Sequence, residues 1–207
     1  MARIDHVVIG VRDLQTAAAA MWDRFGLEPQ PGGDHSGAGT ANLLVPVGND
    51  QFLELLAVTD PQSRHPIVRW LSRVVGDGDR LLAVAVEPDD LDATAARLGE
   101  PIIEQDRVAA DGRRVGFRLT GTMGLLSPEI LPFFVATTAG REWRCGFRPA
   151  RHRANVQGVR WVELGGDEGR IRAQIADAPL PLRVVDARAG VTAVGLGDGG
   201  TEVVLRF

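Results

Sequence analysis

The chain has 207 residues, of which 44% are hydrophobic and 24% charged, and its net charge is −4, a profile typical of globular proteins and unlike that of a nucleic-acid binder. All 23 Lys and Arg residues are arginine and tyrosine is absent, which excludes lysine Schiff-base chemistry, a P-loop and a phenolic acid or base. The single cysteine, Cys145, cannot form an internal disulfide or a Cys-rich metal site.

Residues 1–60 predict a first βαβββ module. The apolar, β-branched segment 3–11 predicts a strand, and 12–25 predicts a helix that Asp13 caps and Gly26 ends. The Gly- and Pro-rich stretch 28–39 predicts a loop. Two further strands are expected at 40–47 and 51–58, joined by the turn at 48–50.

The pattern then restarts after a connecting segment, 61–79, with a short helix near Pro66. Sliding the first unit by 77 positions lays Asp13 on Asp90, which indicates an internal repeat over residues 80–138. We expect a strand at 80–87, a helix at 88–98 that Asp89 or Asp90 caps, and two further strands at 113–120 and 130–136.

An Arg-rich linker, 139–157, and a smaller third βαβββ-like module, 158–207, complete the chain. The basic stretch 141–153 is interpreted either as a solvated linker or as a surface facing an anion, through Arg141, Arg144, Arg148, Arg151, His152 and Arg153. The third module would leave a sheet edge that pairs in a homodimer or packs on its own chain.

The predicted fold class is therefore α+β. Two βαβββ units side by side would make one curved mixed sheet, with helices on its convex side and an open cup for a small-molecule ligand. This arrangement, opening with IDHVVIGVRDL, resembles the vicinal-oxygen-chelate superfamily, which includes glyoxalase I, extradiol dioxygenases, fosfomycin-resistance proteins and bleomycin-binding proteins. The segments at 32–58, 63–71 and 132–135 are most similar to its glyoxalase-like branch.

The resemblance implies metal ligands on the first and last strands of each module, which are His6 and Glu54 in the first. By the strand period of two, His6 shares a face with Ile4 and Val8, and Glu54 shares a face with Phe52 and Leu56. A buried His and Glu need partners. A metal ion, a substrate proton or a plain His–Glu hydrogen bond between strands would each satisfy them.

The second module departs from this pattern, because the positions of His6 and Glu54 fall on Ala83 and near Pro132, which cannot bind metal. His35 in the Gly-rich loop is a third candidate ligand, a substrate contact or acid–base group, or a solvated loop residue. With His6 and Glu54 it would make a two-His, one-carboxylate set suited to Fe, Mn, Zn or Ni. The alternative is that no cofactor is needed.

Four further residues are candidate substrate contacts: Asn42, His65, Trp70 and Phe133. For each a structural role competes, as a turn residue, a helix flank or a core aromatic. Cys145, next to Arg144 and close to Arg148, is expected to have a lowered thiol pKa if it reacts.

The expected function is a glyoxalase-like small-molecule enzyme of lyase, isomerase or dioxygenase type. Glu54, His6 and His35 are the candidate catalytic residues. The alternative is a binding protein that sequesters an antibiotic or a hydrophobic metabolite. No segment predicts a membrane span or a signal peptide, so we expect a cytoplasmic protein with neither membrane nor nucleic-acid partners.

Overall fold

The computed structural model describes residues 1–35, 37–109, 111–137, 145, 148–176, 178–197, 200 and 202–207. The first half of the described chain contains the elements β1 (Arg3–Gly10), α1 (Leu14–Phe25), β2 (Gln30–His35), β3 (Thr40–Gly48), β4 (Gln51–Val58) and α2 (Pro66–Val74). The second half contains β5 (Arg80–Glu87), α3 (Leu91–Leu98), β6 (Ile103–Ala109), β7 (Arg114–Thr120), α4 (Thr122–Leu125), β8 (Phe133–Thr137), β9 (Val159–Gly165), α5 (Glu168–Ile175), β10 (Leu182–Val185), β11 (Gly190–Gly197) and β12 (Glu202–Leu205). The α+β class is confirmed.

The helix boundaries follow from local capping. The Asp13 and Asp90 carboxylates accept hydrogen bonds from the third backbone N–H of α1 and α3. Gly26 and Gly99, both in the left-handed region, end the two helices. These caps are local in sequence, and both helices were therefore predictable.

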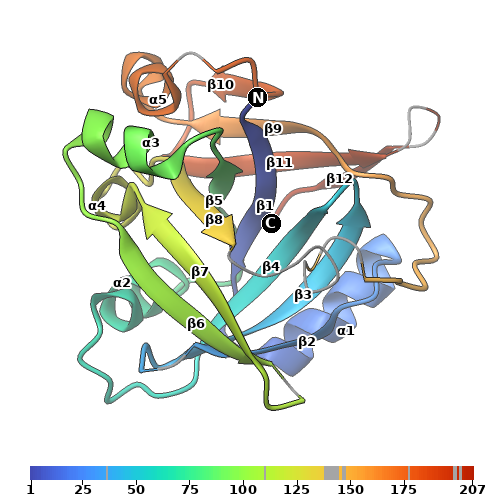
Figure 1. Cartoon of the computed structure of the whole chain (residues 1–207). Coiled ribbons are helices and arrows are strands. Elements are labelled where there is room, and N and C mark those ends of the chain that lie inside the picture. The colour runs from blue at the N-terminus through green and yellow to red at the C-terminus, as the bar shows by residue number, and fades with distance from the viewer. Residues whose placement is uncertain are drawn as a thin grey trace.

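The first eight strands close into a barrel in the order β1–β4–β3–β2–β6–β7–β8–β5, seen from one end in Figure 1. β1 pairs with β5 at one junction, and β2 pairs with β6 at the other. The expected open cup is therefore a closed wall around an interior space. Closure removes the free strand edges that an open sheet would leave.

The register between β1 and β5 agrees with the 77-residue repeat. His6 lies opposite Ala85, and Val8 lies opposite Ala83. In the 77-residue repeat, His6 corresponds to Ala83 and Val8 corresponds to Ala85. The pair His6–Ala85 is therefore equivalent to the pair Ala83–Val8, and an approximate twofold axis passes between the two strands. Ala83 is thus the spatial counterpart of His6.

Two strands of the barrel were not predicted. β2 lies within the stretch expected to be a loop, and β6 lies in a stretch for which no element was expected. The glycines of β2 are explained by close packing, because a Cβ at Gly32 would lie 2.0 Å from Asn42 Oδ1. β8 begins at Phe133, three residues later than expected.

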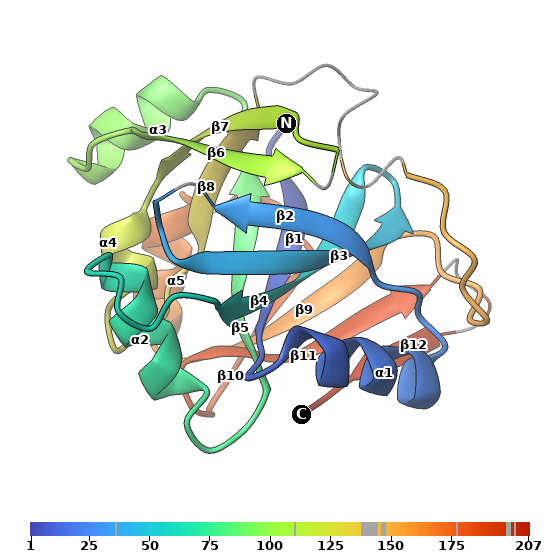
Figure 2. The same ribbon diagram turned by 90° about the horizontal axis from the view of Figure 1, so that it is seen from below.

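The remaining strands form a separate sheet in the order β10–β9–β11–β12. Figure 2 shows this sheet with α1 on the β1 side of the barrel, away from β6 and β7. The main core lies at this junction, where outward side chains of the barrel strands such as Val7 and Leu53 share one apolar cluster with Val162, Val194 and Ile171. The third module has the expected element order but pairs its strands differently from β1–β4–β3–β2.

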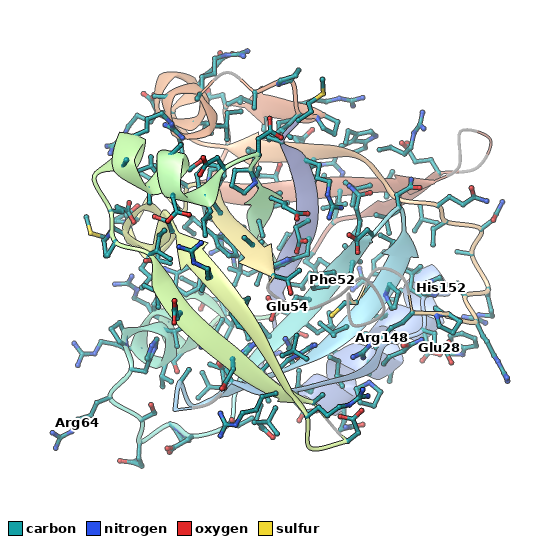
Figure 3. The ribbon with its side chains drawn as sticks, viewed as in Figure 1. Glu28, Phe52, Glu54, Arg64, Arg148 and His152 are labelled. Carbon is teal, nitrogen blue, oxygen red and sulfur yellow. The ribbon has the colours of Figure 1, made fainter. Side chains whose placement is uncertain are left out.

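The described part of the Arg-rich linker packs on the barrel and α1, beside Glu28 (Figure 3). The His152 ring accepts a hydrogen bond from the Glu28 backbone N–H and donates one to the Pro46 carbonyl. Arg148 donates to the Pro31 carbonyl, and the Arg153 backbone N–H donates to the Gly26 carbonyl. The described residues of the linker are thus hydrogen-bonded to the barrel and α1, although Arg151 and Arg153 stay exposed, while Arg141 and Arg144 lie outside the described residues. Within the described chain, no helix has the length and apolar character needed to cross a membrane.

Candidate functional site

The barrel encloses a cavity of about 410 Å³, within the range of small-molecule sites. On β4, Phe52, Glu54 and Leu56 line it, as the period of two predicts, whereas Leu53 and Leu55 face the core outside the barrel. In Figure 3, Glu54 and Phe52 lie in the middle of the barrel. The lining is mainly apolar.

A β-bulge in β1 brings two consecutive polar side chains into the cavity. The pairing of β1 with β5 shifts register between Ile4 and His6, so Asp5 and His6 both line the cavity. Ile4 belongs instead to the core outside the barrel. The expectation that His6 shares a face with Ile4 is therefore wrong, whereas Val8 lines the cavity with it.

His6 lies between two carboxylates. Its Nδ1 is 2.6 Å from Asp5 Oδ1, and its Nε2 is 3.5 Å from Glu54 Oε2. Burial opposes the charged form of the ring, but the hydrogen bonds and charges of Asp5 and Glu54 outweigh it and raise the pKa of His6 to about 9. The ring also stacks on Phe52, with a centroid distance of 4.5 Å. His6 is therefore a buried, oriented imidazolium at neutral pH.

Glu54 is held in its ionised form. Burial favours the neutral carboxyl group, yet the hydrogen bond and charge of His6, with contributions from His35 and Asn42, lower the pKa of Glu54 to about 2. Asn42 Nδ2 donates to Glu54 Oε1 at 2.6 Å. The Asn42 side chain is oriented in turn, because its Oδ1 accepts from the Gly33 N–H at 3.0 Å.

His35, at the end of β2, completes the cluster. Its Nε2 lies 3.3 Å from Asn42 Nδ2 and 3.7 Å from Glu54 Oε1, and its Nδ1 lies 2.9 Å from Thr40 Oγ1. Burial lowers the pKa of His35, and the nearby Arg107 charge acts in the same direction. The ring is therefore neutral. The structure brings together the three residues predicted as catalytic, His6, His35 and Glu54.

Their arrangement does not fit a metal ion. The Asn42 amide nitrogen lies 3.3 Å from His35 Nε2 and 2.6 Å from Glu54 Oε1, so an N–H donor stands against two of the three atoms that would bind a cation. Across the described residues, no group of three or more His, Cys, Asp or Glu side chains has an arrangement that could hold a metal. In this structure His6 and His35 therefore lie within ion-pair distance of Glu54, and Asn42 lies within hydrogen-bond distance of both His35 and Glu54.

The second module supplies apolar side chains where the first supplies polar ones. β1 pairs with β4 so that Val8 lies opposite Glu54, and β5 pairs with β8 so that Ala85 lies opposite Phe133. Phe133, rather than the neighbouring Pro132, is therefore the counterpart of Glu54. Its ring meets His6 edge-on at a centroid distance of 5.8 Å, so it forms a wall of the site.

The remaining candidate substrate contacts lie around this cluster. Trp70 of α2 is buried and lines the cavity, and its indole N–H has no hydrogen-bond partner among the described residues. His65 lines the cavity as well, but it is exposed and its Nδ1 caps α2 by accepting from the Ile67 N–H. Asn42 lines the cavity and holds Glu54 in place.

Two residues of the cavity, Arg107 and Asp5, were not predicted from the sequence. Arg107 lies opposite His35 in the β2–β6 pairing, lines the cavity and is 5% exposed. It was missed because IEQDRVA lacks the alternation of apolar and polar residues that would have indicated a strand. The pKa of the Cys145 thiol is not lowered, because burial raises it despite the charges of Arg107 and Arg148, and the thiol is neutral.

The barrel of two βαβββ units around a buried polar cluster defines the class of fold. The chain belongs to the glyoxalase-like domain family, whose model matches residues 4–178. This confirms the resemblance to the vicinal-oxygen-chelate superfamily. A comparison with curated proteins found no match.

Several solved structures are similar in fold. A hypothetical protein from Staphylococcus aureus shares 14% identity with a TM-score of 0.59, and the alignment covers 100% of this chain and 85% of that one. A Streptomyces coelicolor methylmalonyl-CoA epimerase variant in complex with 2-nitronate-propionyl-CoA shares 22% identity, with a TM-score of 0.47 over 66% of this chain and 98% of its own. The Mycobacterium tuberculosis methylmalonyl-CoA epimerase shares 20% identity, with a TM-score of 0.46 over 68% and 89%.

Proposed function

We propose that this protein is a small-molecule enzyme that transfers a proton to or from a substrate carbon, as an isomerase or a lyase. The observation that carries the proposal is the ionised Glu54 carboxylate, buried in an apolar cavity and facing the imidazolium of His6. Paired groups whose surroundings move their pKa values apart are typical of acid–base sites.

The roles follow from the chemistry of each group. The 3.5 Å separation of His6 Nε2 from Glu54 Oε2 is long for a hydrogen bond, so the N–H can be taken by a substrate carbonyl oxygen. Once His6 binds that oxygen, its hold on Glu54 weakens and burial raises the basicity of the carboxylate.

Glu54 then removes a proton from the carbon next to the carbonyl, and the C–H electron pair moves into the enolate. His6 stabilises the enolate oxygen, or protonates it. Return of the proton to a different face or position gives an isomerase. Loss of a leaving group from the adjacent carbon gives a lyase.

Proton exchange with solvent tests this proposal. We would incubate the protein in D₂O with a panel of small carbonyl compounds that bear an acidic C–H and follow deuterium incorporation by NMR. The wild type is expected to accelerate exchange for some of them, and Glu54→Gln to abolish the acceleration. Glu104→Gln, an exposed carboxylate on the outward face of β6, is the matched control. Exchange that survives in Glu54→Gln would refute the assigned role.

A second candidate is a binding protein without turnover. It is favoured by the apolar Ala83 and Phe133 at the positions that correspond to His6 and Glu54. Such a protein would bind its ligand in the same cavity, so Glu54→Gln would change affinity while no exchange occurred with any ligand that binds.

A homodimer is a further proposal. Among the described strands, β10 and β12 lie at the edges of the four-stranded sheet, and either edge would pair with that of a second copy. Light scattering of the intact protein tests this, and a monomer at all concentrations would exclude it.

A further inference from the structure

A buried guanidinium in the cavity lacks a carboxylate partner. Arg107 is 5% exposed, and its only polar side-chain contact among the described residues is with Cys145 Sγ at 3.5 Å. That thiol is neutral, because burial raises its pKa. Arginine stays protonated in proteins, so the charge of Arg107 is not balanced by direct contact. Burying such a charge is costly unless a partner is supplied.

The position of Arg107 relates it to the proposed acid–base cluster. β4, β3, β2 and β6 are successive strands of the barrel wall, and they carry Glu54, Asn42, His35 and Arg107 on its inner face. Arg107 and His35 are register partners. Asp5, His6 and Cys145 line the same cavity as the guanidinium.

We propose that Arg107 binds the carboxylate of the substrate, and that the substrates are therefore small monocarboxylic acids with an apolar body. The inference rests on the proposed function of the cavity and adds the substrate class. A planar guanidinium matches a carboxylate with two parallel hydrogen bonds. The apolar lining suits the rest of such a ligand, while the carboxylates of Asp5 and Glu54, which line the same cavity, would repel a dianion more strongly than a monoanion.

Binding of matched acids and esters tests the inference. The probes are phenylpyruvate, 3-phenylpropanoate and hexanoate, each compared with its methyl ester by isothermal titration calorimetry, with phenyl phosphate as the dianion. We expect at least one acid to bind about ten- to a hundredfold more tightly than its ester, the gain typical of a charge-assisted hydrogen bond. Phenyl phosphate should bind less tightly than that acid.

The variants assign the preference to the guanidinium. Arg107→Met should remove the difference between acid and ester, and Arg107→Lys should keep part of it. Arg64→Met is the matched control, since Arg64 is exposed and points away from the barrel in Figure 3, and it should keep the full preference. If no acid binds more tightly than its ester, or if the preference persists in Arg107→Met, the inference is overturned.

A second readout separates this inference from the proposed function. Deuterium incorporation at the carbon next to the phenylpyruvate carbonyl depends on Glu54 in the proposal, whereas affinity for the acid depends on Arg107. An acid preference that depends on Arg107, without any exchange, would support the carboxylate-binding role of Arg107 and favour a binding protein over an enzyme. Glu54-dependent exchange without an acid preference would support the proposed enzyme function and refute the carboxylate-binding role of Arg107.

Discussion

Replacing Glu54 with glutamine tests the charge pair at the centre of the cavity. Glutamine has nearly the same shape as glutamate, and its Oε1 can still accept from Asn42 Nδ2, which lies 2.6 Å from the native oxygen. The packing of the site should therefore persist. The substitution removes one of the two carboxylates that keep His6 charged, and Asp5 remains 2.6 Å from the other ring nitrogen.

The expected magnitude follows from the His6 surroundings. An opposite charge within 4–6 Å moves a pKa by about 1–3 units, so the His6 pKa should fall by that amount from its native value of about 9. One unit corresponds to about 1.4 kcal/mol, and the loss in free energy of unfolding should be about 1.4–4 kcal/mol. The His6 and Glu54 shifts arise largely from the same ion pair and are not summed.

The pH dependence of stability has a defined sign. Because the His6 pKa is raised from 6.5 to about 9, its contribution is full below pH 6.5 and is lost as the pH rises through 9. Because the Glu54 pKa is lowered from 4.5 to about 2, its contribution is full above pH 4.5 and is lost as the pH falls through 2. Stability from this pair should be greatest between pH 4.5 and 6.5, and Glu54→Gln should flatten both limbs.

Two measurements check this prediction. Titration of the histidine Cε1–Hε1 signals by NMR gives the His6 pKa in both proteins, with the His6→Gln variant assigning the signal. Urea unfolding across the pH range gives the stability profile, with Glu104→Gln as the control. A wild-type His6 that titrates near 6.5, or an equal His6 pKa in the two proteins, would refute the reasoning.

Further predictions concern the supporting residues. Asn42→Leu should lower the free energy of unfolding by about 1–3 kcal/mol, because it leaves a Glu54 oxygen unpaired in the interior; an unchanged urea midpoint would contradict this. Gly32→Ala should also destabilise the protein, since the added Cβ would meet Asn42 Oδ1 at 2.0 Å, and a thermal melt at or above the wild-type temperature would count against it. Arg107→Met should raise the melting temperature of the ligand-free protein, by about 2–4 °C for each kcal/mol recovered from a buried charge, and a lower melting temperature would show that the guanidinium supports the fold. Calorimetric titration with Zn²⁺ or Mn²⁺ should give no saturable one-to-one binding, because the Asn42 amide N–H lies against both His35 Nε2 and Glu54 Oε1; a tight site would contradict the geometry.

The sequence predicted the features that depend on near neighbours along the chain. The Asp13 and Asp90 caps, the glycines that end α1 and α3, and the alternation along β4 each act over a few residues. They were enough to place Glu54 on an inward face and to show the 77-residue repeat. The resemblance to a known superfamily then selected His6 as its partner on β1.

The tertiary structure decided the features that depend on pairing between distant segments. The barrel closes where β2 meets β6, and both strands lack a clear apolar alternation because they line a partly polar cavity. The bulge that turns Asp5 inward is visible only in the pairing of β1 with β5. Arg107 enters the site only through this closure. A residue's surroundings in a barrel are set by the neighbouring strands, and local sequence does not specify them.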